Sequence, residues 1–320
     1  MRVLITGLGG HLGTRMAQIL EERDDVESVV GVDFVPPRRR LRRSEFHRID
    51  PRDREKLVDF VTEVAPTALV HWGVYEPDAR VPPRQAVEMT EACTVAALGA
   101  AVRGGNLDRV VVRSGLEVYG RGRAHPLVPS EDATPAPSTP FGRSCLDVEA
   151  VAVGLGRRED VPVAALRLAP VVGSRMPSPL GRLLRLPAVP VPAFADPAFS
   201  LLQQEDAARA MIEALLRAHD GPLNVVGAGA VSPWQAVRVG ARVPIPVVGP
   251  GWELARRTAE LAGSPVPDHV VELLRLGRAG DGSRALDALE LGHLTSTPDV
   301  ITELYEWATV TPLPTAKAVA

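Results

Sequence analysis

The chain has 320 residues, of which 45% are hydrophobic and 23% are charged, a composition typical of a globular protein with a sizeable core. Its net charge of −3 gives no general reason to expect nucleic acid or a membrane surface as a partner, and no apolar run approaches the roughly 18 residues of a membrane span. Two cysteines, Cys93 and Cys145, are too few for a disulfide scaffold and predict a reducing, cytoplasmic location.

A glycine-rich turn joins the first predicted strand, residues 2–5, to the first predicted helix. That strand begins so early that we expect no signal peptide. The turn reads Thr6-Gly7-x-x-Gly10-x-x-Gly13. In such a turn the first glycine permits a tight bend, the second lets the backbone approach a pyrophosphate, and the third allows close packing of helix on strand. The helix N-terminus adds free N–H groups and a partial positive charge for the anion.

The second predicted strand, residues 29–32, ends at Asp33. A carboxylate about 20 residues beyond the glycines is placed to hold the ribose hydroxyls of an adenosine. It would repel a 2′-phosphate, so we expect NAD rather than NADP. The alternative, a glycine turn that serves only packing, stays open.

Five arginines follow in the loop at residues 36–43, namely Arg38, Arg39, Arg40, Arg42 and Arg43. The loop is either an anion site, for example for a 2′-phosphate, or a solvated loop, and solvation is the preferred interpretation.

Further strands are expected at residues 46–49, 68–71, 108–113 and 161–168, and helices at 52–64, 84–103 and 141–157. This alternation predicts an α/β fold, a Rossmann-type doubly wound parallel sheet with right-handed crossovers. Ligands bind such sheets at the carboxyl edge of the strands. No Cys/His cluster has metal-ligand spacing, so we expect no metal site. We predict a dinucleotide site formed by Gly7, Gly10, His11, Leu12, Gly13, Asp33, Phe34, Asp50, Trp72 and Gly73.

Residues from 171 onward are rich in proline and predict a smaller, irregular lobe. We expect a cofactor-binding domain at 1–170, which also receives residues 200–226. The substrate lobe would then consist of residues 171–199 and 227–311, and residues 312–320 would form a disordered tail.

The sequence resembles the extended short-chain dehydrogenase/reductase family, the NAD-dependent epimerases and dehydratases of nucleotide sugars. More narrowly, it is similar to an actinobacterial epimerase-like branch with Leu-Asp-Val-Glu at residues 146–149. The resemblance covers nearly the whole chain. It is carried by the glycine turn, Asp33, Asp50, the His71 segment, Ser114, Val118-Tyr119-Gly120, Arg167, Glu205-Asp206 and residues 223–227. It implies NAD, a nucleotide-sugar substrate, and a homodimer formed through the helices at 84–103 and 141–157.

The resemblance also implies three catalytic groups that this chain lacks. A Ser or Thr would orient the substrate carbinol, a Tyr would move its proton, and a Lys one helical turn later would lower the Tyr pKa. Gly115, Phe141 and Cys145 occupy these positions. Neither lysine can substitute, because Lys56 belongs to the predicted helix at 52–64 and Lys317 to the tail.

Substitute groups for proton transfer are Tyr75, Glu117 and Ser114. Cys145 is a further candidate, although a packed thiol is the preferred interpretation. The substrate half is altered too, because Pro170 stands where the family usually has an Asn and Phe199 where it has a diphosphate-binding Arg. Alternative anion contacts would come from three other arginines, Arg175, Arg182 and Arg185.

Two hypotheses follow from these departures. The first is an NAD-dependent oxidoreductase or epimerase-like enzyme with weak or unconventional catalysis. The second is a non-catalytic NAD-binding regulator or partner protein.

Overall fold

The computed structural model describes residues 1–78, 81–103, 106–121, 126–173 and 176–306. The expected tail at 312–320 and Arg175 lie outside these residues. Within the described chain, seven parallel strands form one sheet in the order β10-β6-β5-β4-β1-β2-β3. The strands are β1 (Arg2–Thr6), β2 (Ser28–Asp33), β3 (Glu45–Arg48), β4 (Ala68–His71), β5 (Arg109–Gly115), β6 (Val163–Leu168) and β10 (Gly221–Val225). This confirms the predicted doubly wound α/β fold.

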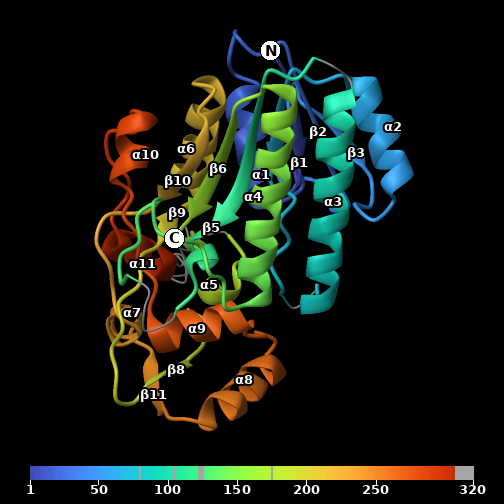
Figure 1. The fold of residues 1–320 in the computed structure, drawn as a ribbon. Helices are drawn as coiled ribbons and strands as arrows, with labels where there is room; N and C mark the ends of the chain where they lie inside the picture. The colour runs from blue at the N-terminus through green and yellow to red at the C-terminus, as the bar shows by residue number, and fades with distance from the viewer. Residues whose placement is uncertain (79–80, 104–105, 122–125, 174–175, 307–320) are drawn as a thin grey trace, which may run out of the picture.

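Helices cover both faces of the sheet (Figure 1). On one face lie α2 (Arg54–Val64), α3 (Pro83–Arg103) and α4 (Pro140–Glu159), and on the other α1 (His11–Leu20) and α6 (Gln204–Leu216). Helix α2 begins two residues later than predicted because the Asp53 side chain caps it by accepting the Lys56 N–H. Helix α4 begins at Pro140, with Thr139 as its cap.

The chain order reverses between β1 and β4, because β2 and β3 extend the sheet on one side of β1 and β4 on the other. The carboxyl ends of β1 and β4 therefore border the crevice where ligands bind in such sheets. Strands β5 and β6 point toward the part of the molecule that holds α5 (Pro179–Leu184) and α9 (Asp268–Leu276) (Figure 1).

The remaining elements are η1 (Leu116–Tyr119), β7 (Val171–Val172), α5 (Pro179–Leu184), β8 (Ala188–Pro192), β9 (Leu202–Gln203), α7 (Pro233–Val239), β11 (Val243–Val247), α8 (Gly251–Leu261), α9 (Asp268–Leu276), α10 (Ser283–Ala288) and α11 (Thr297–Glu306). Residues of α5, β8, α7, β11, α8, α9 and α11 form a second hydrophobic cluster, whereas those of η1 and α10 belong to the cluster around the sheet. Two parallel pairs, β8 with β11 and β7 with β9, were not predicted. Prolines at 190, 192, 244 and 246 obscure the strand pattern of β8 and β11. The division into two domains stays a prediction.

A buried polar network fixes the carboxyl end of β5 to its neighbours. Arg167 of β6 makes three hydrogen bonds to Glu149 of α4. Its Nη2 donates to Oε2 at 2.7 Å, and its Nε donates to Oε1 at 3.0 Å and to Oε2 at 3.3 Å. Ser114 donates to the same carboxylate at 2.5 Å. Arg167 also donates to the Tyr119 hydroxyl, which in turn donates to Asn224 of β10, both at 2.8 Å.

None of the described helices combines the length and apolar character needed to cross a membrane.

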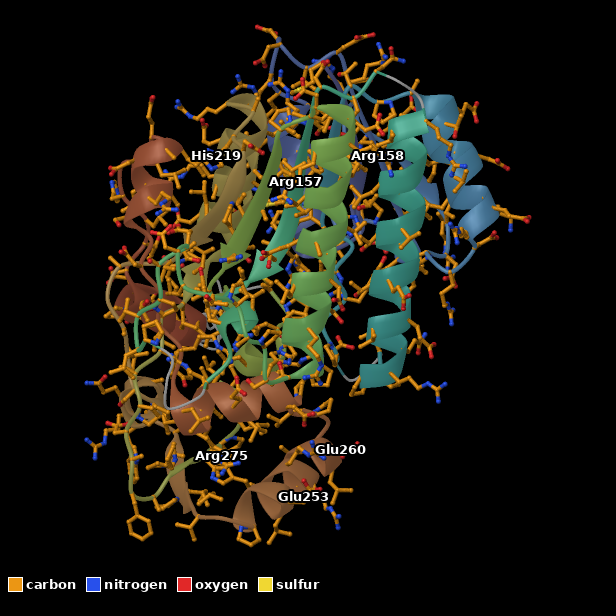
Figure 2. The ribbon with its side chains drawn as sticks, in the orientation of Figure 1. Arg157, Arg158, His219, Glu253, Glu260 and Arg275 are labelled. Atoms are coloured by element: carbon orange, nitrogen blue, oxygen red, sulfur yellow. The ribbon has the colours of Figure 1, made fainter. Side chains whose placement is uncertain are left out.

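Removing one partner of the buried pair should be costly, because an unpaired buried charge remains. We expect Glu149→Ala to lower the free energy of unfolding by about 3–5 kcal/mol. The matched control is Glu159→Ala, which breaks the exposed Arg158–Glu159 pair at the far end of the same helix (Figure 2) and should change it by no more than about 0.5 kcal/mol. Urea unfolding measures both, and equal effects would contradict the role given to the network.

Candidate functional site

The glycine turn holds α1 against the end of β1. Gly7 has φ +76°, in the region that favours glycine. A Cβ at Gly13 would lie 2.8 Å from the Leu8 Cα and would overlap the Gly7 carbonyl oxygen. A Cβ at Gly10 would meet only one atom, the Gly7 oxygen at 3.3 Å. The turn is therefore tightly packed toward the sheet and open at Gly10, as a backbone that receives a ligand must be.

Gly9, which the three-glycine pattern does not include, is as tightly packed as Gly13. A Cβ there would overlap the Val35 carbonyl oxygen and lie 3.1 Å from Asp33 Oδ2. The segment after β2 thus lies directly on the turn. The signal in the sequence is the first glycine of the Gly9-Gly10 pair, which falls at an unspecified position of the three-glycine pattern.

A cavity of about 300 Å³ opens between this turn and the segments that follow β2 and β4, and we call it the first cavity. That volume is at the lower end of ligand pockets. Arg38 of the arginine loop also lines it. Among the predicted residues it brings together Gly7, Gly10, His11, Leu12, Gly13, Asp33, Phe34, Trp72 and Tyr75.

Two predicted residues do not line this cavity. Asp50 binds its neighbour Arg52 through both carboxylate oxygens, at 2.7 and 3.0 Å. Gly73 faces α3, because a Cβ there would lie 2.7 Å from the Cys93 Sγ and 2.9 Å from the His71 Cε1. His71 is fully buried and bonded to Thr6 and Thr94, which is a structural arrangement.

Two polar side chains give the first cavity its chemistry. Burial raises the pKa of Asp33 to about 6, although backbone N–H groups of Phe34 and Val35 act in the opposite direction. Burial lowers the pKa of His11, and the charges of Arg38 and Arg39 lower it further. Among the described residues, His11 Nε2 is buried without a hydrogen-bond partner. The cavity therefore offers a carboxylate and an unused ring nitrogen to a polar ligand.

The sequence candidates for proton transfer are already engaged. Ser114 donates its proton to Glu149 inside the polar network. Burial raises the pKa of Tyr75 well above its usual value, and nearby Cys93 and Asp33 raise it further, so its phenol stays protonated at neutral pH. Burial likewise raises the pKa of the Cys145 thiol, with a further rise from Glu117. Cys145 is thus a packed thiol.

Glu117 fills the space beside Gly115, which has no side chain. A Cβ at Gly115 would overlap Glu117 Oε2, so the carboxylate occupies the room that a serine or threonine at 115 would need. Its other oxygen accepts from Arg278 Nη1 at 2.8 Å. Arg278 is only 2% exposed and also pairs with Glu272. Glu117 is therefore held in a buried ion pair, and no free base stands there.

A second cavity lies beyond the ends of β5 and β6, where α4, α5 and α9 converge. Its volume is about 30 Å³, room for about one water. Phe141 lines it and stacks on His269 of α9, with ring centroids 4.5 Å apart. His269 Nε2 lies 2.9 Å from Glu76 Oε1. Glu76 and Arg113 line both cavities, so the two adjoin there.

Sequence reasoning missed Glu76, Arg113, His269 and Arg278. Of these four, Arg113 could have been recognised from the sequence, because it is a charged residue near the carboxyl end of a buried strand. Pro170 lines the second cavity, whereas Phe199 is buried in the second hydrophobic cluster.

Within the part of the chain that the structure describes, no group of three or more His, Cys, Asp or Glu side chains is arranged for a metal ion.

The packing of the turn can be tested with one methyl group. We expect Gly13→Ala to destabilise the protein by about 1–3 kcal/mol, because the methyl overlaps the backbone of residues 7 and 8. Gly154→Ala on α4 is the matched control, since a Cβ there meets nothing within 4 Å and should stabilise the helix by up to about 1 kcal/mol. Thermal unfolding separates the two, and a neutral Gly13→Ala would show that α1 is not held as described.

Several known proteins are similar to this chain. Uncharacterised proteins of Mycobacterium tuberculosis and Mycobacterium bovis are each 33% identical over 269 residues, 79% of this chain and 69% of theirs. The solved UDP-glucuronic acid 4-epimerase of Bacillus cereus, in complex with UDP-glucuronic acid and NAD, matches with a TM-score of 0.73 at 19% identity, over 96% of this chain and 98% of that one.

A second solved structure, UDP-glucose 4-epimerase of Thermotoga maritima with UDP-glucose, has a TM-score of 0.71 at 18% identity, over 96% of this chain and 98% of that one. At these identities, both structural matches show that the fold is shared. The model of the NAD dependent epimerase/dehydratase family matches residues 3–226. With more than half of its length matched, the chain belongs to the NAD dependent epimerase/dehydratase family.

Proposed function

We propose that this protein binds NAD in the first cavity and acts on a small molecule, a nucleotide sugar or a close relative, with weak or unconventional catalysis. The observation that carries the proposal is the first cavity itself. It joins an open glycine turn, a helix N-terminus, the Asp33 carboxylate and the unpartnered His11 nitrogen. These groups match the pyrophosphate and ribose of a dinucleotide.

In this proposal the turn from Gly7 to Gly13 holds the pyrophosphate, and Asp33 accepts hydrogen bonds from the adenosine ribose. Bound NAD supplies an acceptor for hydride. Trp72 and Tyr75 close the first cavity on the side of β4. Asp33 also disfavours a 2′-phosphate, which supports NAD over NADP, although Arg38 lies at the same cavity. The solved Bacillus cereus epimerase contains NAD, which supports this choice.

The substrate class rests on weaker support. Solved structures with this fold hold UDP-glucuronic acid or UDP-glucose, and the second cavity adjoins the first, as a substrate pocket must. Pro170 and the buried Phe199 replace two groups that the family resemblance implies for substrate binding. We therefore propose the class and leave the sugar open.

A specific observation favours a second candidate, a non-catalytic NAD-binding regulator. The second cavity holds only about one water, and the Glu117–Arg278 pair and the Phe141–His269 stack lie beside it. A sugar ring needs more room, so an enzyme must widen this cavity on binding. Protein that holds NAD but gives no sugar-dependent change in NADH absorbance would favour the regulator.

We also propose a cytoplasmic homodimer formed through α3 and α4. These helices pack side by side (Figure 1), and each exposes an apolar side chain, Val95 and Val151. A dimer of about twice the 34.2 kDa chain mass is expected in light scattering at micromolar concentration. A monomer there would refute the interface.

Calorimetric titration with NAD tests the proposed cofactor site. Because Asp33 has a pKa of about 6, its carboxylate is ionised at pH 8 and mostly protonated at pH 5, so NAD should bind about tenfold more weakly at pH 5. Asp33→Asn should weaken binding roughly 10- to 100-fold at pH 8 and remove this pH dependence.

Asp50→Asn is the matched control, since Asp50 is an acidic side chain after the adjacent strand but faces Arg52. It should bind NAD as the unmodified protein does. Equal effects of the two substitutions, or no binding of NAD by the unmodified protein, would contradict the proposed site.

A further inference from the structure

Three charged or titratable side chains line the second cavity together with Phe141, and each comes from a different segment. Glu76 follows β4, Arg113 lies on β5 and His269 lies in the first turn of α9. They gather at the position where the resemblance implies a tyrosine and, one helical turn on, a lysine.

His269 lies directly against the Phe141 ring. The two ring centroids are 4.5 Å apart with planes inclined by 32°, and the imidazole is 5% exposed. A tyrosine at 141 would carry its hydroxyl on this same ring. The His269 imidazole is therefore a proton-accepting group stacked on the ring that, as a tyrosine, would carry the hydroxyl.

Glu76 orients the imidazole. Its Oε1 is 2.9 Å from His269 Nε2, and Arg113 Nη2 lies 4.0 Å from Oε2. Burial alone would raise the pKa of Glu76, but the His269 bond and the charges of His269 and Arg113 outweigh it, against a small opposing effect of Asp78, so the pKa is lowered. Glu76 is thus a carboxylate. In the neutral imidazole, an Nε2–H donated to this carboxylate leaves Nδ1 as the nitrogen that takes up a proton.

Arg113 brings a fixed positive charge to the same place. Its Nη1 donates to the Val74 carbonyl at 2.9 Å, and its guanidinium carbon lies 6.0 Å from the centre of the Phe141 ring. Its charge also acts on the Cys145 thiol, the position where the resemblance implies the lysine. Because Arg113 lines both cavities, this cation stands between the proposed NAD site and the second cavity.

We propose that proton transfer has moved from α4 to α9, with His269 as the proton acceptor, Glu76 as its positioning residue, and Arg113 as the cation in place of the lysine. The inference rests on the proposed function. In the reaction it serves, the substrate O–H bond breaks and its proton goes to the imidazole. The carbinol C–H bond breaks as a hydride that passes to NAD, so the alcohol becomes a ketone and NAD⁺ becomes NADH.

The first test needs no turnover. Carbon-13 NMR of the Glu76 carboxyl should show that its pKa rises in His269→Gln, because burial then acts without the imidazole to oppose it. His219→Gln is the matched control. His219 is half-buried at the opposite end of the molecule from α9 (Figure 2), and its loss should leave the Glu76 pKa unchanged. A Glu76 pKa that does not move in His269→Gln would overturn the proposed pairing.

The second test uses NAD-loaded protein with UDP-glucose and UDP-glucuronic acid as probes, followed by NADH absorbance and NMR of the sugar. His269→Gln should lower kcat by about 10²–10⁴-fold with unchanged NAD affinity, whereas His219→Gln should match the unmodified protein. Glu76→Gln should shift the acidic limb of the rate–pH profile, a change that loss of packing alone would not cause. Arg113→Lys should keep more activity than Arg113→Met.

The outcomes separate the two proposals. If the unmodified protein binds no NAD, the proposed function fails and this inference fails with it. If it binds NAD but turns over neither probe, or if His269→Gln keeps its rate within about twofold, the inference is overturned while the NAD site stands. Unfolding midpoints of all variants identify any that fail to fold, and Glu76→Gln then carries the test in place of His269→Gln.

Discussion

The close approach of α1 to the end of β1 is the constraint on which the rest of the site depends. It exists because residues 7 and 13 carry no side chain, so that the backbone of the helix and the turn touch. This contact fixes the N-terminus of α1 at the crevice between β1 and β4. Asp33, Trp72 and the first cavity then follow from the register of a parallel sheet, which brings the carboxyl ends of its strands to one edge.

The three positions where the resemblance implies a Ser or Thr, a Tyr and a Lys have neighbours that fit the residues present. The carboxylate of Glu117 fills the room beside Gly115, the His269 ring lies on Phe141, and the charge of Arg113 reaches Cys145. Each of these three groups comes from an element other than α4. Such mutual fit is expected at any buried site, because an unpaired charge or an unfilled space there would cost stability.

The sheet was predictable because each buried strand and each amphipathic helix carries its own local pattern, and right-handed crossovers leave few ways to connect them. Local ion pairing explains why Asp50 does not line the first cavity, since Arg52 is only two residues away. His269 and Arg278 carry no local signal. Both come from beyond residue 226, where the family match ends, and only tertiary packing brings α9 against the start of α4. Strands β8 and β11 were missed because their prolines obscure alternation.

The most direct test of the account is to denature the purified protein and identify what it releases by mass spectrometry. We expect NAD, recovered in up to equimolar amount or bound on addition, since the first cavity has the glycine turn, carboxylate and free imidazole nitrogen that a dinucleotide requires. Recovery of no dinucleotide, together with no binding of added NAD, would contradict the account. It would mean that the fold has kept the turn for packing alone.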